Sequence, residues 1–547
     1  MAGAAAAYHA ACLDHNMPPR LPGGELRTLW LALENRGTRE WDPGAVHLTI
    51  RLDGARVTQV DLPHPVAPGQ RVTVHWVFRA TSERGGHRLE VDLAGPEPGF
   101  APDDGWPVRL PFHVDRAAPT ESGRLRDRVL ETHARSWLPC DGVSWSTSGA
   151  GYPQFAREAR GCRMVDVEGR TYVDYLMGWG SALLGYAPER IRRAVESALA
   201  SGATPTLTHR FMPEVADALC ALFPGAEAAT FGKNGSDVCT AAVRMARVYT
   251  GRPIVLACGY HGWQDWHVER WGFAATGVPE RPEPLVLAFE PHSLPQVAEL
   301  LAQHRGRVAA VMLEPAGVIE GTNGPIRQAD HAFLRDLMAL AHGEGALVIF
   351  DEILTGFRHP GGSVQRAAGV APDLTCVGKA LSGGLPLSAL VGRREVFASA
   401  VGRIHYEPTF KGEVYSLAAA REALALYREQ DVPRLVGAWG ERLRAAVDEL
   451  CATLGIPARM IGPPYRMMVV FDEAAPRRRL LMRTLFQQEL IKGGVLTTQN
   501  LFLPSLAHDE EAFELTLRAF RHALERLGEV GAKDRFASAL EIPPLPG

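Results

Sequence analysis

The sequence predicts an α/β protein in which helices flank a mostly parallel sheet, and an all-β sandwich precedes it. Residues 1–115 alternate apolar and polar side chains with the period of two that is typical of strands. Further along, an apolar run at 307–313, an amphipathic helical pattern at 332–342 and a second apolar run at 346–351 follow one another. This order indicates the βαβ unit of a parallel sheet.

Within residues 1–115, turn signals such as Asp53-Gly and Arg84-Gly-Gly separate the alternating apolar runs. Short strands at this spacing indicate an antiparallel β-sandwich. The runs are Val46 to Leu52, Val72 to Phe78, Leu89 to Leu93 and Val108 to Val114.

Two features of this region bear on a ligand. The segment Glu34 to Trp41, together with Pro68-Gly-Gln, loosely resembles immunoglobulin-like domains of bacterial polysaccharide-synthesis and polysaccharide-export proteins, some of which bind sugar. Trp41 and Trp76 can stack on a sugar ring, but packing in a core is the commoner role of tryptophan. We therefore expect both in the core, and carbohydrate binding stays open as the alternative.

Composition and charge indicate a soluble enzyme with several domains. The 547 residues exceed the size of one domain, and 46% of them are apolar, which is enough for large cores. A formal net charge of −4 gives no indication of a nucleic-acid partner or of an acidic membrane surface. No apolar run approaches the roughly 20 residues that span a bilayer, and Met1–Ala7 lacks the basic start and apolar centre of a signal peptide. The eight cysteines form no CxxC pair, so we expect reduced cysteines, a cytoplasmic location and no metal site.

Lys379 stands out because the chain contains only five lysines among its 58 basic residues. Arginine stays protonated, whereas a lysine amine can lose its proton and attack a carbonyl group. A chain that uses arginine elsewhere keeps lysine where arginine cannot replace it. Lys379 follows the apolar run 374–377 and precedes a glycine-rich turn, which places it at a strand end. Taken alone it also fits a buried structural lysine, but its neighbours along the chain favour an imine-forming residue.

Asp351 is the first of these neighbours. It ends the apolar run 346–351, and ligands of parallel sheets bind at the carboxyl ends of the strands. A carboxylate at that place can pair with a protonated pyridine nitrogen. A lysine imine combined with such an aspartate is the arrangement that pyridoxal 5'-phosphate (PLP) enzymes need.

A turn and an aromatic residue complete the set. The turn of Asn234, Gly235 and Ser236 opens directly into a helix, whose free N–H groups and dipole favour a phosphate. Ser236 also fits an ordinary N-cap, although a cap alone does not explain the glycines of the turn. Tyr260, which follows a short strand at 253–257, is placed to stack on a planar cofactor.

Taken in order, these segments resemble a known family. The chain from Cys162 to Leu527 is similar to the class III (fold type I) PLP-dependent aminotransferases, nearest to the glutamate-1-semialdehyde aminomutase branch. One such motif alone is weak, but eight in register are strong. The eight segments begin at Asp166, Gly178, Thr230, Gly259, Leu313, Asp351, Gly378 and Pro408.

The resemblance implies roles for individual residues. Lys379 is implied to be the imine lysine, Asp351 the partner of the pyridine nitrogen, and Glu314 a residue near the ring hydroxyl or the substrate. The phosphate turn described above is implied to hold the PLP phosphate. Tyr260 is implied to stack on the ring, with the adjacent His261 also in the cofactor site.

The resemblance also implies a homodimer with shared active sites, in which Thr409 of one subunit holds the PLP phosphate of the other. It further implies a smaller α+β domain beside the large one, and the order of the domains along the chain. The expected parts are the sandwich at 1–115, a linker and the first part of a small domain at 116–190, a large PLP-binding domain at 191–429, the second part of the small domain at 430–530, and a tail at 531–547.

We expect an aminotransferase that moves an amino group between a small-molecule amino donor and a keto or aldehyde acceptor. One alternative is a 2,1-aminomutase like the nearest branch. That branch usually carries a Ser-Pro-Val-Arg segment whose arginine holds the substrate carboxylate, and Ser146 to Arg157 has no such arginine in register. The other alternative is a degenerate member that serves as a binding or regulatory protein. Intact Lys379 and Asp351 argue against it.

The phosphate turn carries a hint about the substrate. Its sequence departs from the commoner Asn-Ser-Gly-Thr-Glu-Ala and resembles a subgroup of bacterial surface-polysaccharide and natural-product pathways. Together with the sandwich, it favours an amino-sugar, polyol or small phosphorylated carbonyl substrate, on the basis of association alone.

Overall fold

The computed structural model describes most of the chain. Predicted segments that lie outside it include the stretch Ser146 to Gly151 and the last part of the tail. The described residues are 10–15, 17, 20–23, 26–95, 106–115, 121–132, 153, 155–268, 277–279, 283–316, 326–327, 330–498, 500–533 and 535–541.

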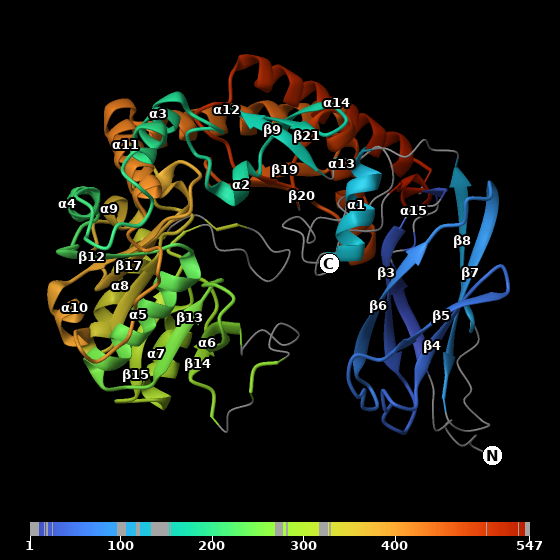
Figure 1. The fold of residues 1–547 in the computed structure, drawn as a ribbon, viewed down its shortest axis with the longest axis horizontal. Helices are drawn as coiled ribbons and strands as arrows, with labels where there is room; N and C mark the ends of the chain where they lie inside the picture. The colour runs from blue at the N-terminus through green and yellow to red at the C-terminus, as the bar shows by residue number, and fades with distance from the viewer. Residues whose placement is uncertain are drawn as a thin grey trace.

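The first part of the chain consists of two packed sheets (Figure 1, blue). One sheet has the strand order β1-β3-β6 and the other has the order β2-β8-β7-β4-β5. All neighbouring strands are antiparallel except the pair β2 and β8. The strands are β1 (Ala10–His15), β2 (Arg20–Pro22), β3 (Leu26–Asn35), β4 (His47–Leu52), β5 (Ala55–Asp61), β6 (Arg71–Arg79), β7 (Gly85–Ala94) and β8 (Val108–Asp115).

The four predicted runs correspond to β4, β6, β7 and β8, and their apolar residues point into one shared core. The sequence analysis missed β1, β2, β3 and β5. β5 is an edge strand with exposed or half-exposed side chains, so burial imposes no alternation on it. In β3 the alternation is present at Leu29, Leu31 and Leu33, all of which are buried.

The expectation that Trp41 and Trp76 pack in the core is confirmed. Trp41 is fully buried and Trp76 is 6% exposed. A ring that is enclosed in this way cannot stack on a sugar, so that alternative is wrong for these two residues. Asn35 fixes the neighbouring turn, because its side-chain amide donates to the carbonyl oxygens of Arg39 (2.8 Å) and Val66 (2.7 Å).

Helix α1 (Glu121–Thr132) lies between the sandwich and the rest of the molecule (Figure 1). Its N-terminus is fixed to the second part of the chain, because the Ser122 backbone N–H (2.8 Å) and hydroxyl (2.6 Å) both donate to the Glu168 carboxylate. A carboxylate at a helix N-terminus satisfies free N–H groups and interacts favourably with the dipole. Residues 133–152, which follow α1 along the chain, lie outside the described part.

Seven strands form the main sheet, in the order β12-β18-β17-β16-β15-β13-β14. The five strands from β17 to β14 are parallel, whereas β18 is antiparallel to both of its neighbours. All residues of the four strands from β17 to β13 are buried, since helices cover both faces of a sheet of this kind. The strands are β12 (Ala228–Gly232), β13 (Ile254–Cys258), β14 (Val286–Ala288), β15 (Val308–Leu313), β16 (Leu347–Asp351), β17 (Leu374–Val377) and β18 (Ser388–Gly392). The predicted βαβ unit is β15, α8 (His331–Gly343) and β16.

The N-terminal and C-terminal ends of this second part meet in one smaller sheet, because β11 runs parallel to β21 and pairs Val173 with Val495. The sheet has the order β21-β11-β10-β9, and a three-stranded sheet β19-β20-β22 lies in the same region. Its strands are β9 (Ala156–Arg160), β10 (Arg163–Asp166), β11 (Thr171–Asp174), β19 (Ala458–Ile461), β20 (Met467–Phe471), β21 (Val495–Leu496) and β22 (Leu501–Phe502).

The fold class is therefore as predicted, and the domain boundaries remain our proposal. Among the described residues, no helix is long and apolar enough to cross a membrane. The remaining helices are α2 (Met177–Gly180), α3 (Glu189–Leu199), α4 (Phe211–Leu222), α5 (Gly235–Thr250), α6 (Asp265–Val268), α7 (Leu294–Gln303), α9 (Val364–Ala368), α10 (Arg394–Ala400), α11 (Val414–Gln430), α12 (Val432–Leu454), α13 (Pro476–Lys492), α14 (Glu510–Gly531) and α15 (Phe536–Ala539).

We predict that deletion of residues 1–115 leaves PLP binding unchanged, because the sandwich closes its core with its own side chains. Action on a large substrate can weaken, since a second point of attachment would be lost. The measurement is the visible absorbance of PLP added to the truncated protein, with the full chain as control. A truncated protein that is folded but gives no such absorbance would contradict the domain division.

Candidate active site

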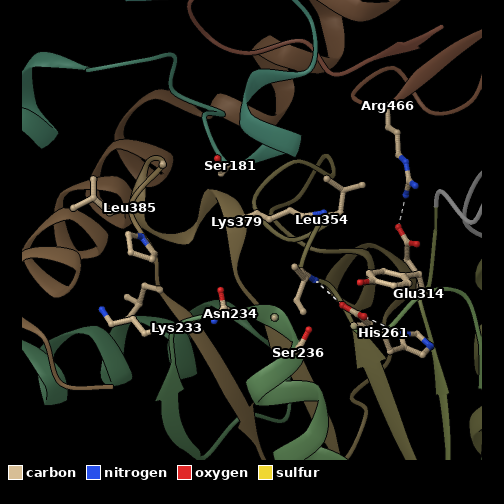
Figure 2. A pocket seen from close by; sticks show the side chains of 18 residues that line it. Ser181, Lys233, Asn234, Ser236, His261, Glu314, Leu354, Lys379, Leu385 and Arg466 are labelled. Carbon is tan, nitrogen blue, oxygen red and sulfur yellow. Dashed lines mark hydrogen bonds and ion pairs between the residues drawn. The ribbon is translucent and has the colours of Figure 1, made fainter. Parts of the chain in front are cut away.

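A cavity of about 420 Å³ opens where the parallel strands of the main sheet end (Figure 2). Glu314 follows β15, Asp351 ends β16 and Lys379 follows β17, so their side chains meet at one edge of the sheet. The cavity is lined by Ser181, Lys233, Asn234, Gly235, Ser236, Tyr260, His261, Gly262, Glu314, Asp351, Ile353, Leu354, Lys379, Gly384, Leu385, Pro386, Leu387 and Arg466.

Lys379 begins a short 3₁₀ helix directly after β17 and adopts a left-handed backbone conformation, with φ of 45°. A non-glycine residue in this conformation is strained, and such strain concentrates at functional sites. Burial first and then the nearby Arg466 cation lower the pKa of the Lys379 amine to about 8, against the opposing charges of Glu314 and Asp351. A deprotonated, nucleophilic amine is therefore accessible near neutral pH.

Asp351 is buried at the end of β16 and is held by three donors, the weakest of which is the Cys239 thiol at 3.7 Å. His261 Nδ1 donates to one carboxylate oxygen at 2.8 Å, and the Ile353 backbone N–H donates to the other at 3.1 Å. The His261 backbone N–H in turn donates to His267 Nε2 at 3.0 Å, so this nitrogen of His267 carries no proton. The contacts fix the orientation of the carboxylate toward the cavity.

The phosphate turn leads from β12 into α5, a helix of 16 residues. Its N-cap is Asn234, and the Asp237 side chain accepts hydrogen bonds from the backbone N–H groups of Lys233 (3.1 Å) and Asn234 (2.9 Å). The prediction of Ser236 as the N-cap is wrong, because the helix already begins at Gly235 and Ser236 lies inside its first turn. No hydrogen bond within the described residues uses the N–H of Gly235 or Ser236, so both are available to an anion.

Two glycines allow this turn to lie against its neighbours. A Cβ atom on Gly235 would lie 2.5 Å from Ile353 Cδ1, and a Cβ atom on Gly262 would lie 2.4 Å from Ser236 Oγ. A side chain at Gly235 would push the turn away from the loop that follows Asp351, and a side chain at Gly262 would push it away from the loop that follows β13. The glycines thus bring an anion site and the buried carboxylate into one cavity.

The structure brings eight of the nine predicted site residues together, and their individual roles stay predictions. The exception is Thr409, which is exposed and does not line the cavity of its own chain. The eight are Asn234, Gly235, Ser236, Tyr260, His261, Glu314, Asp351 and Lys379.

Sequence reasoning missed Arg466, which precedes β20 and comes from the C-terminal part of the chain. It is buried, and its Nη1 donates to the carboxylate of Glu314, which is half-buried (Figure 2). Burial raises the pKa of the Glu314 carboxyl group, and the charge of Arg466 opposes that shift. The Nε of Arg466 is buried without an acceptor among the described residues. No local motif marks this arginine, because the fold alone brings it to the cavity.

Lys233 was also missed, although its type was a usable signal in a lysine-poor chain. Its amine donates to Glu413 at 2.8 Å and to the Ser416 hydroxyl at 3.3 Å. Glu413 in turn caps the N-terminus of α11. The pair therefore connects the phosphate turn to the segment that carries Thr409.

The cavity fits a planar pyridine that carries a phosphate. Free N–H groups and the Ser236 hydroxyl are available for the phosphate at the start of α5, and Asp351 supplies a carboxylate for a ring nitrogen. The Lys379 amine is available for a carbonyl group, and the Tyr260 ring borders the cavity with 56% of its surface exposed.

Comparison with known proteins defines the family. Residues 146–523 match the family described as aminotransferase class-III, so the chain belongs to the class III aminotransferases. These enzymes use PLP as their cofactor, as the solved relatives bound to PLP or to its amine form, PMP, illustrate.

Two curated relatives show how the family divides. The chain is 30% identical over 377 residues to the 3-aminobutyryl-CoA aminotransferase of Cloacimonas acidaminovorans, which covers 68% of this chain and 89% of the relative. It is 31% identical over 434 residues to the glutamate-1-semialdehyde 2,1-aminomutase of Syntrophobacter fumaroxidans, which covers 75% of this chain and 99% of the relative. The two relatives belong to the two reaction types that the sequence left open.

Solved structures support the same fold. The FumI protein of Sphingopyxis sp. MTA144 superimposes with a TM-score of 0.68 at 26% identity, covering 76% of this chain and 99% of its own. A glutamate-1-semialdehyde aminomutase from Pseudomonas aeruginosa PAO1 gives a TM-score of 0.65 at 25% identity, covering 73% and 93%. The family match over residues 146–523 does not include the sandwich.

We predict that the attachment of PLP to the cofactor-free protein depends on pH through Lys379. The neutral amine is the nucleophile, so the rate should rise about tenfold per pH unit below a pKa of about 8 and level off above it. Stopped-flow absorbance after mixing with PLP measures this rate. Arg466→Met removes a cation that lowers this pKa, so its profile should shift to higher pH. A profile of the unchanged protein that levels off only near 10.5, the ordinary value for lysine, would contradict the assignment.

Proposed function

We propose that this protein is an aminotransferase that moves an amino group between a small-molecule amino donor and a keto or aldehyde acceptor. One observation carries the proposal: a lysine amine with a lowered pKa shares a cavity with a buried carboxylate and a helix N-terminus that can bind phosphate. PLP, when bound, supplies the electron sink for bond breaking next to an amino group.

In this proposal Lys379 performs two tasks. Its neutral amine would hold PLP at the carbonyl group of the cofactor, and once an amino substrate has displaced it, Nζ would accept and return a proton at the substrate carbon. Asp351, oriented by His261, would hold the pyridine nitrogen in its protonated form through a charge-assisted hydrogen bond. The phosphate turn would hold the phosphate, and Tyr260 would lie against the ring.

The Glu314–Arg466 pair supports a carboxylate on at least one substrate. A guanidinium offers five donors, and in this pair only Nη1 is engaged by Glu314, while Nε has no acceptor. A substrate carboxylate can bind there through two parallel hydrogen bonds. When the substrate has no carboxylate, Glu314 neutralises the arginine.

We predict that Arg466→Met discriminates between two amines that share a reacting centre, 3-amino-3-phenylpropanoate and 1-phenylethylamine. A hydrogen bond between charged groups contributes about 1.5–3 kcal/mol, so kcat/KM for the acid should fall roughly 10- to 100-fold. The neutral amine has no carboxylate to lose and should change little. The half-reaction, followed by the change of PLP absorbance, measures both, and an equal loss for the two amines would contradict the carboxylate role.

Thr409 remains our proposal for a shared site in a homodimer. Its exposure in one chain is compatible with a partner's phosphate as its target, and the Lys233–Glu413 pair connects its segment to the phosphate turn.

We predict that mixing the Lys379→Ala and Thr409→Ala variants restores one PLP site in each mixed dimer. Lys379 of one chain and Thr409 of the other then form an unaltered site, and titration with PLP followed by absorbance should detect it. A mixture that only averages the two parents would show that each chain is self-contained. Mixing each variant with itself is the control.

The aminomutase alternative has one observation in its favour. Sequence analysis placed it second because Ser146 to Arg157 has no carboxylate-binding arginine in register, and part of that stretch lies outside the described residues. Arg466 supplies a cation from another part of the fold, which weakens that argument. An aminomutase transfers the amino group within one molecule. Conversion of glutamate-1-semialdehyde without an added amino donor or acceptor would favour it over the aminotransferase.

The pathway is a further part of the proposal. The form of the phosphate turn and the presence of a sandwich support a role in polysaccharide, amino-sugar or natural-product biosynthesis. Burial of Trp41 and Trp76 removes one argument for a sugar site in the sandwich.

A further inference from the structure

One wall of the cavity has an unusual backbone. Four successive residues, Met177, Gly178, Trp179 and Gly180, have positive φ angles of 48°, 58°, 55° and 84°. Two of them are not glycine, so the conformation is strained and persists only where surrounding contacts hold it. We call residues 177–181 the wall segment. Its last residue, Ser181, lines the cavity on the side of Lys379 opposite to Asn234 and Ser236 (Figure 2).

Arg358 contacts this segment from the inside of the protein. Its side chain is fully buried, Nη2 donates to the Gly180 carbonyl oxygen at 2.7 Å, and Nη1 donates to the Pro504 carbonyl oxygen at 3.2 Å. Within the described residues no carboxylate lies within ion-pair distance of Arg358, and its Nε has no acceptor. Burying a cation that is held only by carbonyl groups lowers the stability of the fold. We therefore expect Arg358 to have a specific role.

The wall segment packs tightly against Leu354 and Arg358 at Gly180. A Cβ atom on Gly180 would lie 2.6 Å from Leu354 Cδ1 and 3.5 Å from Arg358 Nη2. Leu354 lines the cavity and belongs to the turn that follows Asp351. The C-terminal segment reaches the same place, because the Leu503 N–H donates to the Tyr175 carbonyl oxygen at 2.8 Å.

We propose that Arg358 is a positioning residue: it holds the wall segment in its left-handed conformation against the turn after Asp351 and thereby fixes the substrate side of the cavity. One guanidinium fork spans carbonyl groups from two segments that lie far apart in the sequence. A lysine ammonium is a point charge and cannot reproduce that fork. The inference rests on the proposed function only in taking this side as the one where an amino substrate binds.

Hydrogen–deuterium exchange of the PLP-loaded protein tests the proposal without a known substrate. The amides of Gly180, Ser181 and Ala182 donate within the loop and report on its opening. In Arg358→Met we expect exchange in a peptide covering 176–182 to become about tenfold faster or more, while a peptide from α5 stays unchanged. Arg358→Lys should give an intermediate rate.

Arg366→Met is the matched control. Arg366 also donates to main-chain carbonyl oxygens, those of Ala221 and Leu222, but it is exposed and does not line the cavity. The control should exchange like the unchanged protein in both peptides.

A second readout uses aminooxyacetate, which carries a carboxylate and reacts with bound PLP, and methoxyamine, which reacts without one. Misplacement of binding groups by about 1 Å can lower rates a hundredfold, so the half-saturating aminooxyacetate concentration should rise about tenfold or more in Arg358→Met. The second-order rate with methoxyamine should change little. If the unchanged protein does not react with either probe, the proposed function fails, while the exchange result still decides the role of Arg358.

Gly180→Ala loosens the same wall segment from the other side, because the new Cβ meets Leu354 and φ is 84°. If both residues hold the same wall segment, their effects should not be independent. Arg358→Met should then change the exchange rate and the aminooxyacetate concentration by a smaller factor in the Gly180→Ala protein than in the unchanged protein. If Arg358→Met does not fold, the single variants Gly180→Ala and Arg358→Lys are used for the same two measurements. Two results would overturn the proposal. One is that the Arg358 variants match the Arg366 control in both readouts, and the other is that the fold-changes caused by Arg358→Met and Gly180→Ala multiply in the double variant.

Discussion

The buried carboxylate of Asp351 is the constraint around which the cavity is arranged. A carboxylate that is buried at the end of a parallel strand must be satisfied by donors, and here His261 Nδ1, the Ile353 N–H and the Cys239 thiol provide them. The parallel register of β15, β16 and β17 then sets Glu314 and Lys379 at the neighbouring strand ends. Helix α5 points its free N–H groups into the same space because Gly235 packs closely on Ile353.

The charges around Lys379 determine the protonation of its amine. Two buried arginines, Arg466 and Arg358, lie near Lys379 and join burial in lowering the pKa of its amine. Only Arg466 has a carboxylate partner, Glu314. Arg358 stays a cation, since burial lowers its pKa only to about 10. The cavity is thus prepared for a neutral amine on Lys379 and for anions at two separate places, the start of α5 and Arg466.

Much of this could be read from the sequence, for identifiable reasons. Asp351 and Lys379 could be found because each follows an apolar run of strand length, and the turn at 234–236 because a short polar turn opens into a long helix. Arg466 could not, because only the pairing of distant segments brings it near Glu314. The N-cap was misplaced because Ser236 and Asn234 are both good capping residues, and only the position of Asp237 decides between them. Strand β5 escaped notice because an exposed edge strand needs no apolar alternation.

Chemical trapping of the lysine that binds PLP tests the central claim most directly. The protein is loaded with PLP, reduced with borohydride and cleaved after arginine, which places Lys379 in peptide 367–393, Lys233 in 211–244 and Lys411 in 404–421. Lys233 is engaged with Glu413 and Lys411 with Glu407, so neither amine is free to attack a carbonyl. The account predicts that the label is in peptide 367–393 alone. A label on either of the other two peptides would contradict it.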